Sequence, residues 1–321
     1  MNRFTSFDGT RITYHDEGEG PAVILLHGFA VDALGQYGHL DRLRPIFEAA
    51  KAWLREMLGA VPPMPEPPAE GRPGLIARLR EAGARVVALD QRGFGASDKP
   101  HDPAAYAHSA LARDVLALID HLRLDAADVL GFSMGAVTAA KLLALGAPQV
   151  RSAILAGVGQ YILDGEVMEL PENFPMADAP KPLTLRAHSE AVASALACDE
   201  TVPGNLGSAY LNLMRALGND PKALAAVLRG DGAEPVSPAA LHKVQVPVLV
   251  LNGREDLANQ AVGRLPEVLP NARKAACDGD HHSAPWYPSF QQAVVDFFAE
   301  QWRARGIQLG GPQARAESGK C

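Results

Sequence analysis

The stretch Asp128–Leu145, DVLGFSMGAVTAAKLLAL, constrains the fold more than any other part of the chain. A short apolar run is followed by a break at Gly131-Phe132-Ser133-Met134-Gly135 and then by small residues at helical spacing, which predicts a strand, a sharp turn and a helix. Glycine on either side of the turn allows backbone segments to approach more closely than a β-carbon would permit. Ser133 lies at the turn, where its hydroxyl would project beyond the sheet above a helix N-terminus. A nucleophile needs this geometry, and the alternative is a tight turn with a solvated serine.

Apolar strands and helical patterns alternate through much of the chain. The predicted buried strands are Ala22–Leu26, Val86–Leu89, Val129–Leu130, Ala153–Ala156 and Val248–Leu251, with a further strand at Ala272–Ala276. The predicted helices between them are Leu75–Ala82, Ser109–Leu122, Met134–Leu145 and Gln260–Leu269. This alternation is typical of an α/β fold, a parallel sheet covered by helices on both faces. Two short segments joined at Asp8-Gly9, Arg3–Phe7 and Arg11–His15, predict an antiparallel edge.

Three parts of the chain do not follow this alternation. Residues 35–74 combine an amphipathic helix with a proline-rich run, VPPMPEPP, which we expect to be extended. Residues 159–244 predict a helical cap, with helical patterns at Thr184–Ala197, Gly207–Leu217 and Pro221–Leu228. Residues 307–321 contain few apolar side chains and predict a flexible tail. The core of the fold is then expected at 1–158 and 245–306.

Length and composition bound the classes of function. A chain of 321 residues, 47% hydrophobic and 21% charged, is typical of a soluble globular protein, and no apolar run is long enough to span a bilayer. The N-terminal MNRFTSFDGTR lacks the apolar core of a signal peptide, so we expect a cytoplasmic protein. The widely spaced Cys198, Cys277 and Cys321 are then expected to be reduced. A net charge of −7 without a basic block disfavours nucleic acid and anionic membranes as partners.

A serine hydroxyl attacks poorly unless a base accepts its proton, and the base works best when a third group orients it. Candidates for both follow the last two predicted strands: one is followed by Asn252-Gly253-Arg254-Glu255-Asp256 and the other by Asp278-Gly279-Asp280-His281-His282. Both segments would lie at the carboxyl edge of the sheet, as Ser133 would. The order serine, acid, histidine is the one expected for this type of turn. The remaining histidines lack the spacing of a metal site, so we expect no metal.

Five motifs together resemble the α/β-hydrolase superfamily, in particular the small capped hydrolases that include carboxylesterases and carbon–carbon bond hydrolases. They are His27-Gly28-Phe29, Asp90-Gln91-Arg92-Gly93-Phe94-Gly95-Ala96-Ser97, Gly131-Phe132-Ser133-Met134-Gly135, Gly253 with Asp256, and Gly279-Asp280-His281. The resemblance fails in the two insertions. It implies an α/β-hydrolase fold, with a mostly parallel eight-stranded sheet flanked by helices and a helical cap insertion.

The resemblance also implies roles for particular residues. The catalytic positions fall on Ser133, Asp256 and His281, and the oxyanion donors on the backbone N–H groups of Phe29 and Met134. Supporting positions are His27, Gly28, Gly131 and Gly135.

Several of these assignments have alternatives. Glu255 is the alternative acid, and His282 is the alternative base. His27 is expected to shape the oxyanion loop rather than to react. Arg92 and Asp98 are expected to fasten the loop after the strand Val86–Leu89. The insertion at 35–74 follows the oxyanion loop, so it could form a second lid, a surface decoration or a dimer contact.

Serine at the elbow separates this chain from the haloalkane dehalogenases and epoxide hydrolases, which resemble this fold but carry aspartate there. We interpret the chain as a cofactor-independent serine hydrolase that cleaves a carboxylic ester of a small, largely apolar substrate through an acyl-enzyme. Phe132 is expected to supply an apolar flank, whereas Arg186 and Arg215 lack a spacing that would place either of them at a substrate carboxylate. The alternatives are a carbon–carbon bond hydrolase of ring-cleavage products, a thioesterase or acyl transferase, and a non-catalytic small-molecule receptor. The expected partner is a small-molecule substrate, and a homodimer stays open.

Overall fold

The computed structural model describes residues 1–38, 72–167, 184–197, 211, 214, 215, 217–256, 263–281 and 283–307. Several predicted features lie outside these residues: the amphipathic helix and proline-rich run of the first insertion, much of the predicted helix Gly207–Leu217, His282, and the tail from 308 onward. Among the described helices, none is long and apolar enough to cross a membrane.

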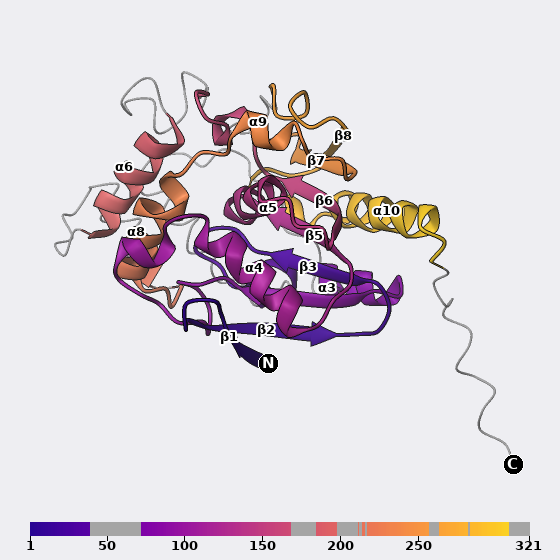
Figure 1. Cartoon of the computed structure of the whole chain (residues 1–321), viewed down its shortest axis with the longest axis horizontal. Coiled ribbons are helices and arrows are strands. Elements are labelled where there is room, and N and C mark those ends of the chain that lie inside the picture. Colours follow the sequence, from indigo (N-terminus) through magenta and orange to yellow (C-terminus); the bar gives the residue numbers. More distant parts are fainter. Residues whose placement is uncertain are drawn as a thin grey trace, which may run out of the picture.

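One eight-stranded sheet forms the centre of the fold (Figure 1). Its strands are β1 (Asn2–Thr5), β2 (Arg11–Glu17), β3 (Ala22–Leu26), β4 (Arg85–Asp90), β5 (Ala127–Phe132), β6 (Val150–Ala156), β7 (Val248–Gly253) and β8 (Ala272–Cys277). Their spatial order is β1-β2-β4-β3-β5-β6-β7-β8. The pairs β1–β2 and β2–β4 are antiparallel and the others are parallel. The predicted antiparallel edge and the mostly parallel eight-stranded sheet are confirmed.

The helices that the structure describes connect or follow these strands in the chain. They are α1 (Ala33–Tyr37), α3 (Leu75–Glu81), α4 (Ala110–His121), α5 (Met134–Ala144), α6 (Leu185–Ala197), α8 (Pro221–Arg229), α9 (Pro238–Leu241) and α10 (Pro288–Ala304). The 3₁₀ turns are η2 (Pro103–Tyr106), η3 (Gln160–Ile162), η4 (Asp231–Ala233) and η5 (Ala284–Trp286). Local chemistry explains several helix starts. Asp32 accepts from the Gly35 N–H at 2.6 Å and caps α1, and Asp220 caps α8 in the same way.

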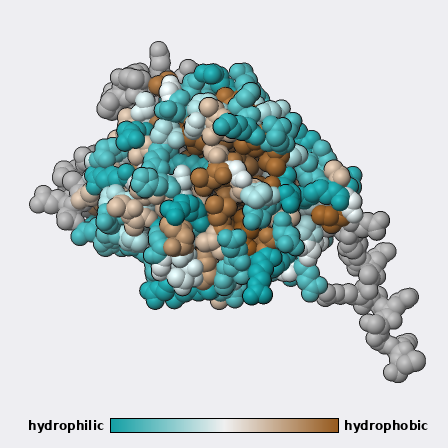
Figure 2. Space-filling view, in the orientation of Figure 1, coloured by the Kyte–Doolittle hydropathy of each residue, from teal (hydrophilic) through white to brown (hydrophobic). Residues whose placement is uncertain are grey.

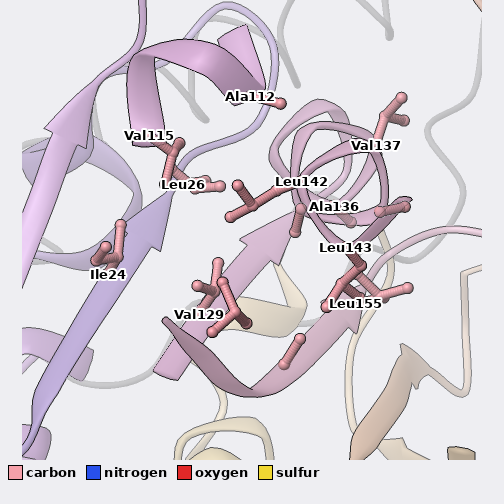
Figure 3. Packing of buried hydrophobic residues seen from close by; sticks show 14 of the residues in the cluster. Ile24, Leu26, Ala112, Val115, Val129, Ala136, Val137, Leu142, Leu143 and Leu155 are labelled. Carbon is pink, nitrogen blue, oxygen red and sulfur yellow. The ribbon is translucent and has the colours of Figure 1, made fainter. Parts of the chain in front are cut away.

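Two apolar cores lie on opposite faces of the sheet, because successive side chains of a strand point to opposite sides. In β3, Ile24 and Leu26 enter the first core, whereas Val23 and Leu25 enter the second. Side chains of α4 and α5 close the first core (Figure 3), and side chains of α3 and α10 close the second. Burial on both faces explains why the central strands are continuous apolar runs.

α10 is absent from the helices predicted above. It begins at Pro288, whose fixed φ suits the first helical position, and it buries Phe290, Phe297 and Trp302 against the sheet. The indole N–H of Trp302 donates to Asp128 of β5 at 2.7 Å, which ties the helix to the strand that precedes Ser133. The apolar spacing of α10 is helical, so the signal for this helix was present in the sequence.

The predicted helix Gln260–Leu269 is wrong where the structure describes it. Residues 263–269 form turns, and 257–262 lie outside the described residues. Pro266 explains the difference, because proline has no N–H to donate and disfavours helical backbone at Leu265 before it.

The face shown in Figure 2 is mostly hydrophilic, with apolar side chains gathered near its centre, where α4 and α5 lie in Figure 1. Leu116 and Ala117 of α4 and Ala144 of α5 are only partly buried. Helical cover on this side comes mainly from α4 and α5, because α9 spans only four residues and 263–269 form turns.

α6 and α8 confirm two of the helices predicted for the insertion at 159–244, and they lie side by side at one end of the sheet (Figure 1). They form a third apolar cluster with residues of the core, including Ala30, Phe94 and Tyr106. α8 also reaches the loop after β4, since a β-carbon on Gly93 would lie 2.8 Å from the Val227 side chain. The boundaries of the cap at 159 and 244 stay a prediction.

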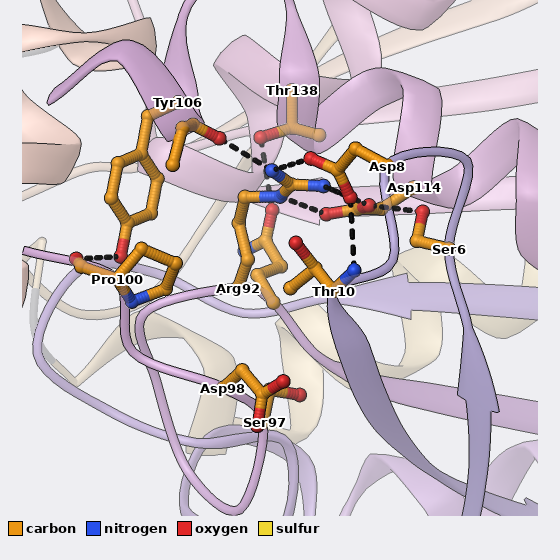
Figure 4. A network of polar contacts seen from close by, with 12 residues as sticks. Ser6, Asp8, Thr10, Arg92, Ser97, Asp98, Pro100, Tyr106, Asp114 and Thr138 are labelled. Atoms are coloured by element: carbon orange, nitrogen blue, oxygen red, sulfur yellow. Dashed lines mark hydrogen bonds and ion pairs between the residues drawn. The ribbon is translucent and has the colours of Figure 1, made fainter. Parts of the chain in front are cut away.

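Arg92 is fully buried in the loop after β4, where it pairs with two carboxylates (Figure 4). Its guanidinium donates to Asp114 of α4 at 2.6 and 2.7 Å and to Asp8 of the β1–β2 turn at 2.7 Å. Burial opposes the charge of Arg92, but the hydrogen bonds and charges of Asp114 and Asp8 raise its pKa above the ordinary value. Asp98 of the same loop pairs with Arg11 of β2 at 3.0 Å. Arg92 and Asp98 therefore both fasten this loop, as predicted.

We expect Arg92→Met to lower the free energy of unfolding by about 3–5 kcal/mol, because it would leave the nearly inaccessible Asp114 as a buried carboxylate without its cation. Adding Asp114→Asn should recover part of this loss. The control is Arg11→Met, which removes an exposed ion pair and should change stability far less. Urea unfolding followed by circular dichroism measures all three variants. Equal losses in Arg92→Met and Arg11→Met would contradict the prediction.

The residues that flank 39–71 lie next to each other in the fold. Gly38 follows α1, and Gly74 precedes α3. The two are in contact, because a β-carbon on Gly74 would overlap the carbonyl oxygens of Gly38 and Tyr37. The Tyr37 hydroxyl donates to the Leu26 carbonyl at the end of β3 at 2.8 Å. Both ends of the stretch are therefore anchored beside the segment that follows β3.

Candidate active site

The predicted elbow forms where β5 ends and α5 begins. Ser133 has φ 54° and ψ −117°, a backbone conformation that non-glycine residues rarely adopt. The crossing is tight, since a β-carbon on Gly131 would overlap the Gly135 carbonyl and one on Gly135 would overlap the Leu26 carbonyl of β3. The Ser133 N–H donates to the Ala156 carbonyl at the end of β6 at 2.8 Å. Neighbouring strands thus hold the strained turn, and the hydroxyl is presented at the carboxyl edge of the sheet.

Ser133, His281 and Asp256 lie in a chain of hydrogen bonds. Ser133 Oγ is 3.0 Å from His281 Nε2, and His281 Nδ1 is 2.9 Å from Asp256 Oδ2. Asp256 follows β7 and is almost completely buried, whereas the side chain of His281, after β8, is 27% exposed. An ionised carboxylate only accepts hydrogen bonds, so Nδ1 carries the proton and Nε2 is left to accept from the serine hydroxyl. The structure therefore brings together the three side chains that the sequence analysis singled out.

Glu255, the alternative acid, fastens the two loops that carry Asp256 and His281. Its carboxylate accepts from the Gly279 N–H at 2.7 Å, and its own N–H donates to the Gly279 carbonyl at 3.2 Å. Arg254 adds an ion pair to Asp278 across the same two loops at 2.5 Å. His282, the alternative base, lies outside the described residues.

The surroundings of His281 favour its protonated form. Burial disfavours the charged ring, but the hydrogen bond and charge of Asp256, together with the charge of Asp280, raise the pKa of His281 above its ordinary value. This is the electrostatic setting that stabilises an imidazolium formed during a reaction.

Phe132 does not supply the apolar flank that we expected for a substrate. Its ring lies 5.4 Å from the ring of His281 and 6.0 Å from that of Phe290 in α10, measured between centroids, and the residue is only 4% exposed. Alternation along β5 explains this position, because Phe132 points into the second core. The Phe132 ring therefore packs against the imidazole of His281 and leaves little surface open for a substrate.

The loop His27–Ala30 after β3 carries the predicted oxyanion donor at Phe29. The Gln91 N–H donates to His27 Nε2 at 3.0 Å, so the ring proton is on Nδ1, which donates to the Gly28 carbonyl at 2.7 Å. His27 is completely buried, and burial lowers its pKa, which suits this neutral form. The C=O and N–H of a trans peptide point in opposite directions, so fixing the Gly28 carbonyl also orients the Phe29 N–H. These hydrogen bonds fix the course of the loop, and the supporting role of His27 in an oxyanion hole stays a prediction.

Several side chains without a predicted role in this loop also hold it in place. Gln91 Nε2 donates to the His27 carbonyl at 2.8 Å, and Gln36 of α1 accepts from the Gly28 N–H at 3.3 Å. Thr138, in the second turn of α5, donates to Gln91 at 2.9 Å and so connects the loop to the helix after the elbow. Asn219, which precedes α8, donates to the Ala30 carbonyl at 2.8 Å. Gln91 lies within the motif Asp90–Ser97, so the sequence offered a signal for it. The contact of Asn219 depends on how the insertion packs against the core, so no local signal marks it.

The loop after β6 completes the surroundings of the site. Asn252 at the end of β7 accepts from the Gly157 N–H at 3.0 Å and donates to the Val158 carbonyl at 2.9 Å. Burial, and then the charge of Asp256, raise the pKa of Tyr161 in this loop. Among the described residues, no group of three or more His, Cys, Asp or Glu side chains could hold a metal ion.

This geometry is matched by a known family. A sequence model described as the alpha/beta hydrolase fold matches residues 21–288, which run from β3 through the elbow and the loops of Asp256 and His281 to the start of α10. The chain belongs to this family. The resemblance inferred from the five motifs is confirmed.

Similar members of the hydrolase family carry several names. A putative non-heme chloroperoxidase of Synechocystis sp. is 23% identical over 303 residues, which cover 86% of this chain and 89% of that protein. An epoxide hydrolase 2 of Siraitia grosvenorii is 27% identical over 134 residues, 42% of this chain and 31% of that protein.

Solved structures of hydrolases share the fold over most of the chain. An esterase from Exiguobacterium antarcticum has a TM-score of 0.60 at 21% identity and covers 94% of this chain and 98% of its own. A meta-cleavage product hydrolase from Pseudomonas fluorescens IP01 has a TM-score of 0.58 at 20% identity, with coverage of 94% and 98%. At identities this low, the structural similarity establishes a common fold alone. The reaction of this hydrolase therefore has to be inferred from its own site.

Proposed function

We propose that this α/β-hydrolase is a serine hydrolase that cleaves the carboxylic ester of a small, largely apolar substrate through an acyl-enzyme. The observation that carries the proposal is the chain of contacts from Ser133 Oγ through both ring nitrogens of His281 to the buried Asp256, at 3.0 and 2.9 Å. A hydroxyl becomes an effective nucleophile when a positioned base accepts its proton and a third group orients that base.

In the proposed reaction, Ser133 Oγ attacks the acyl carbon while His281 Nε2 accepts the hydroxyl proton. Asp256 stabilises the resulting imidazolium. The negative oxygen of the tetrahedral intermediate binds the N–H groups of Phe29 and Met134. Met134 is the first residue of α5, where helix geometry leaves the N–H without an intrahelical acceptor. His281 then returns the proton to the leaving alcohol, and water releases the acid from Ser133 by the same steps.

A serine nucleophile favours acyl transfer over the epoxide opening that the names of the epoxide hydrolase relatives indicate. Attack of the Ser133 oxygen on an epoxide would leave an ether, which water cleaves poorly. Attack on an acyl carbon leaves an ester, which the same base and donors can hydrolyse. The epoxide hydrolase match also spans less than a third of that relative.

The surroundings of Ser133 favour an uncharged acyl group. Phe29 and Met134, the two proposed donors, pack their side chains against the third apolar cluster, formed largely by α6 and α8. Leu217 from the same insertion also packs there. Arg186 and Arg215 are both exposed to solvent. An apolar acyl chain would thus meet apolar side chains next to the elbow.

The proposal is tested by assaying the purified protein against p-nitrophenyl esters of graded chain length and against a vinylogous 1,5-diketone ring-cleavage product. We expect turnover of the esters and a preference for one range of chain lengths. A diketone that is turned over orders of magnitude more efficiently than every ester would replace the ester proposal with carbon–carbon cleavage. Thioesters in the same assay separate a thioesterase from an esterase.

A receptor on the same fold would not need the activated serine. Labelling with a fluorophosphonate probe separates the two classes, because the probe reacts with a serine whose proton is accepted by a neighbouring base. We expect stoichiometric labelling of Ser133. An unlabelled protein without turnover would favour a small-molecule receptor.

The acid limb of the pH profile of kcat/KM should have its midpoint above about 6.5, the ordinary pKa of histidine. The pKa of His281 is raised, and the neutral ring is the base, so activity is present above this pKa and is lost as the pH falls through it. In Asp256→Asn the midpoint of the residual activity should move down, because burial remains while the hydrogen bond and charge of Asp256 are gone. A wild-type midpoint below 6.5, or no change in the variant, would contradict this assignment.

A further inference from the structure

The carbonyl groups of the oxyanion loop are held by side chains from three different parts of the chain. Gln91 binds the His27 carbonyl, and the Nδ1–H of His27 binds the Gly28 carbonyl. The Ala30 carbonyl accepts from Asn219 Nδ2 at 2.8 Å, across 189 residues of sequence. Ala30 has φ 66°, a left-handed conformation that is uncommon for alanine, and it is buried. A residue in this conformation keeps it only while its surroundings hold it there.

Backbone hydrogen bonds hold Asn219 to the residues before it, and α8 begins two residues after it. Its N–H donates to the Met214 carbonyl at 3.1 Å, and the Gly218 N–H donates to the Arg215 carbonyl at 2.9 Å with Gly218 at φ 75°. This pair of bonds is the glycine-terminated motif that closes a helix. The next residue, Asp220, caps α8 by accepting from Lys222 and Ala223 at 3.0 and 3.2 Å. The Asn219 amide therefore belongs to a hydrogen-bonded corner of the insertion.

α8 connects this corner to the rest of the insertion and to the core. It packs against α6, and its Val227 lies against Gly93 in the loop after β4. The Ala30 side chain belongs to the same apolar cluster as α6 and α8. A shift of α8 relative to the sheet would thus pull on the backbone just after the Phe29 N–H.

We propose that Asn219 is a positioning residue that couples the insertion to the oxyanion hole. It holds the Ala30 carbonyl, and through it the orientation of the Phe29 N–H, only when α8 is docked on the core. The consequence for catalysis rests on the proposed serine hydrolase function, whereas the anchoring of the loop does not.

The test compares Asn219→Ala and Asn219→Asp with Lys222→Ala. Asn219→Asp keeps the shape of the side chain but removes its N–H donors, and Lys222 is an exposed neighbour on the same corner. Hydrogen exchange measured by mass spectrometry reports the amides of residues 27–33 without any turnover. We expect faster exchange there in both Asn219 variants and wild-type exchange in Lys222→Ala.

Kinetics supply the second readout. We expect kcat for esters to fall about tenfold in both Asn219 variants with KM within about twofold, since a misplaced donor loses part of the 10²–10³ that an intact oxyanion donor supplies. The Ki of an aryl boronic acid, whose adduct with Ser133 places an oxygen in the oxyanion hole, should rise by the same factor. Active sites are counted by fluorophosphonate titration.

Two results would overturn the proposal. One is unchanged exchange of residues 27–33 in both Asn219 variants. The other is a loss of kcat equal to the loss of titratable sites, with an unchanged boronate Ki, because that pattern means misfolding of a fraction of the protein. Wild-type protein that neither turns over esters nor binds the boronate would refute the serine hydrolase function, and the exchange data would still decide whether Asn219 anchors the loop.

Discussion

Ser133→Ala should lower ester turnover by about 10⁴-fold or more while leaving the fold intact. The substitution removes the oxygen that would carry the acyl group, and neither His281 nor the oxyanion donors can replace it. Stability should change little, because alanine meets the same backbone strain at φ 54° as serine does. Turnover of p-nitrophenyl esters and fluorophosphonate labelling measure the loss, and urea unfolding measures the stability.

The control for this variant is Ser133→Cys, which keeps a nucleophile at the elbow. It should retain acylation by the most reactive esters, so that loss in Ser133→Ala can be assigned to the missing nucleophile rather than to a disturbed turn. Wild-type activity in a correctly folded Ser133→Ala protein would refute the role of Ser133.

Asp256→Asn should lower kcat by about 10³–10⁴-fold, the second largest effect that we expect. The amide of asparagine can donate to His281 Nδ1, which favours the tautomer whose Nε2 carries the proton and cannot accept one from Ser133. It also removes the charge that would stabilise the imidazolium. Kinetics at a pH above the acid limb separate this loss from a simple change in the protonation of His281.

Glu255→Gln is the matched control, because Glu255 is the neighbour of Asp256 in the chain. The Glu255 carboxylate accepts from the Gly279 N–H at 2.7 Å. The glutamine can still accept that hydrogen bond, so kcat should fall far less than in Asp256→Asn. If Glu255→Gln lost as much activity as Asp256→Asn, the assignment of the acid to Asp256 would be wrong.

The elbow and the two loops opposite it could be predicted because their signals are local. Apolar runs mark β5, β7 and β8, and parallel strands place their carboxyl ends at one edge. Ser133 and His281 could therefore be expected to meet although 148 residues separate them. The same reasoning could not choose between Asp256 and Glu255 beyond the motif spacing, since the choice depends on which carboxylate turns toward the imidazole.

Other features depend on tertiary packing, or their sequence signals conflict with one another. Phe132 was expected to face a substrate, but the alternation of β5 sends it into the core beneath His281. The apolar period at 260–269 suggested a helix, although Pro266 opposes one. The hydrogen bond from Asn219 to Ala30 requires the insertion to dock on the core, and no short-range pattern records that docking.

The contact between Gly38 and Gly74 brings the two flanks of residues 39–71 together at one point of the fold. A chain that departs and returns at one point can change length without altering the register of any strand, and each doubling of a flexible loop adds only about 0.6 kcal/mol of closure entropy. The junction is thus a natural exchange point. A different sequence grafted there would begin and end beside the loop that follows β3, so this corner of the fold can acquire new recognition elements while the arrangement of Ser133, His281 and Asp256 stays as it is.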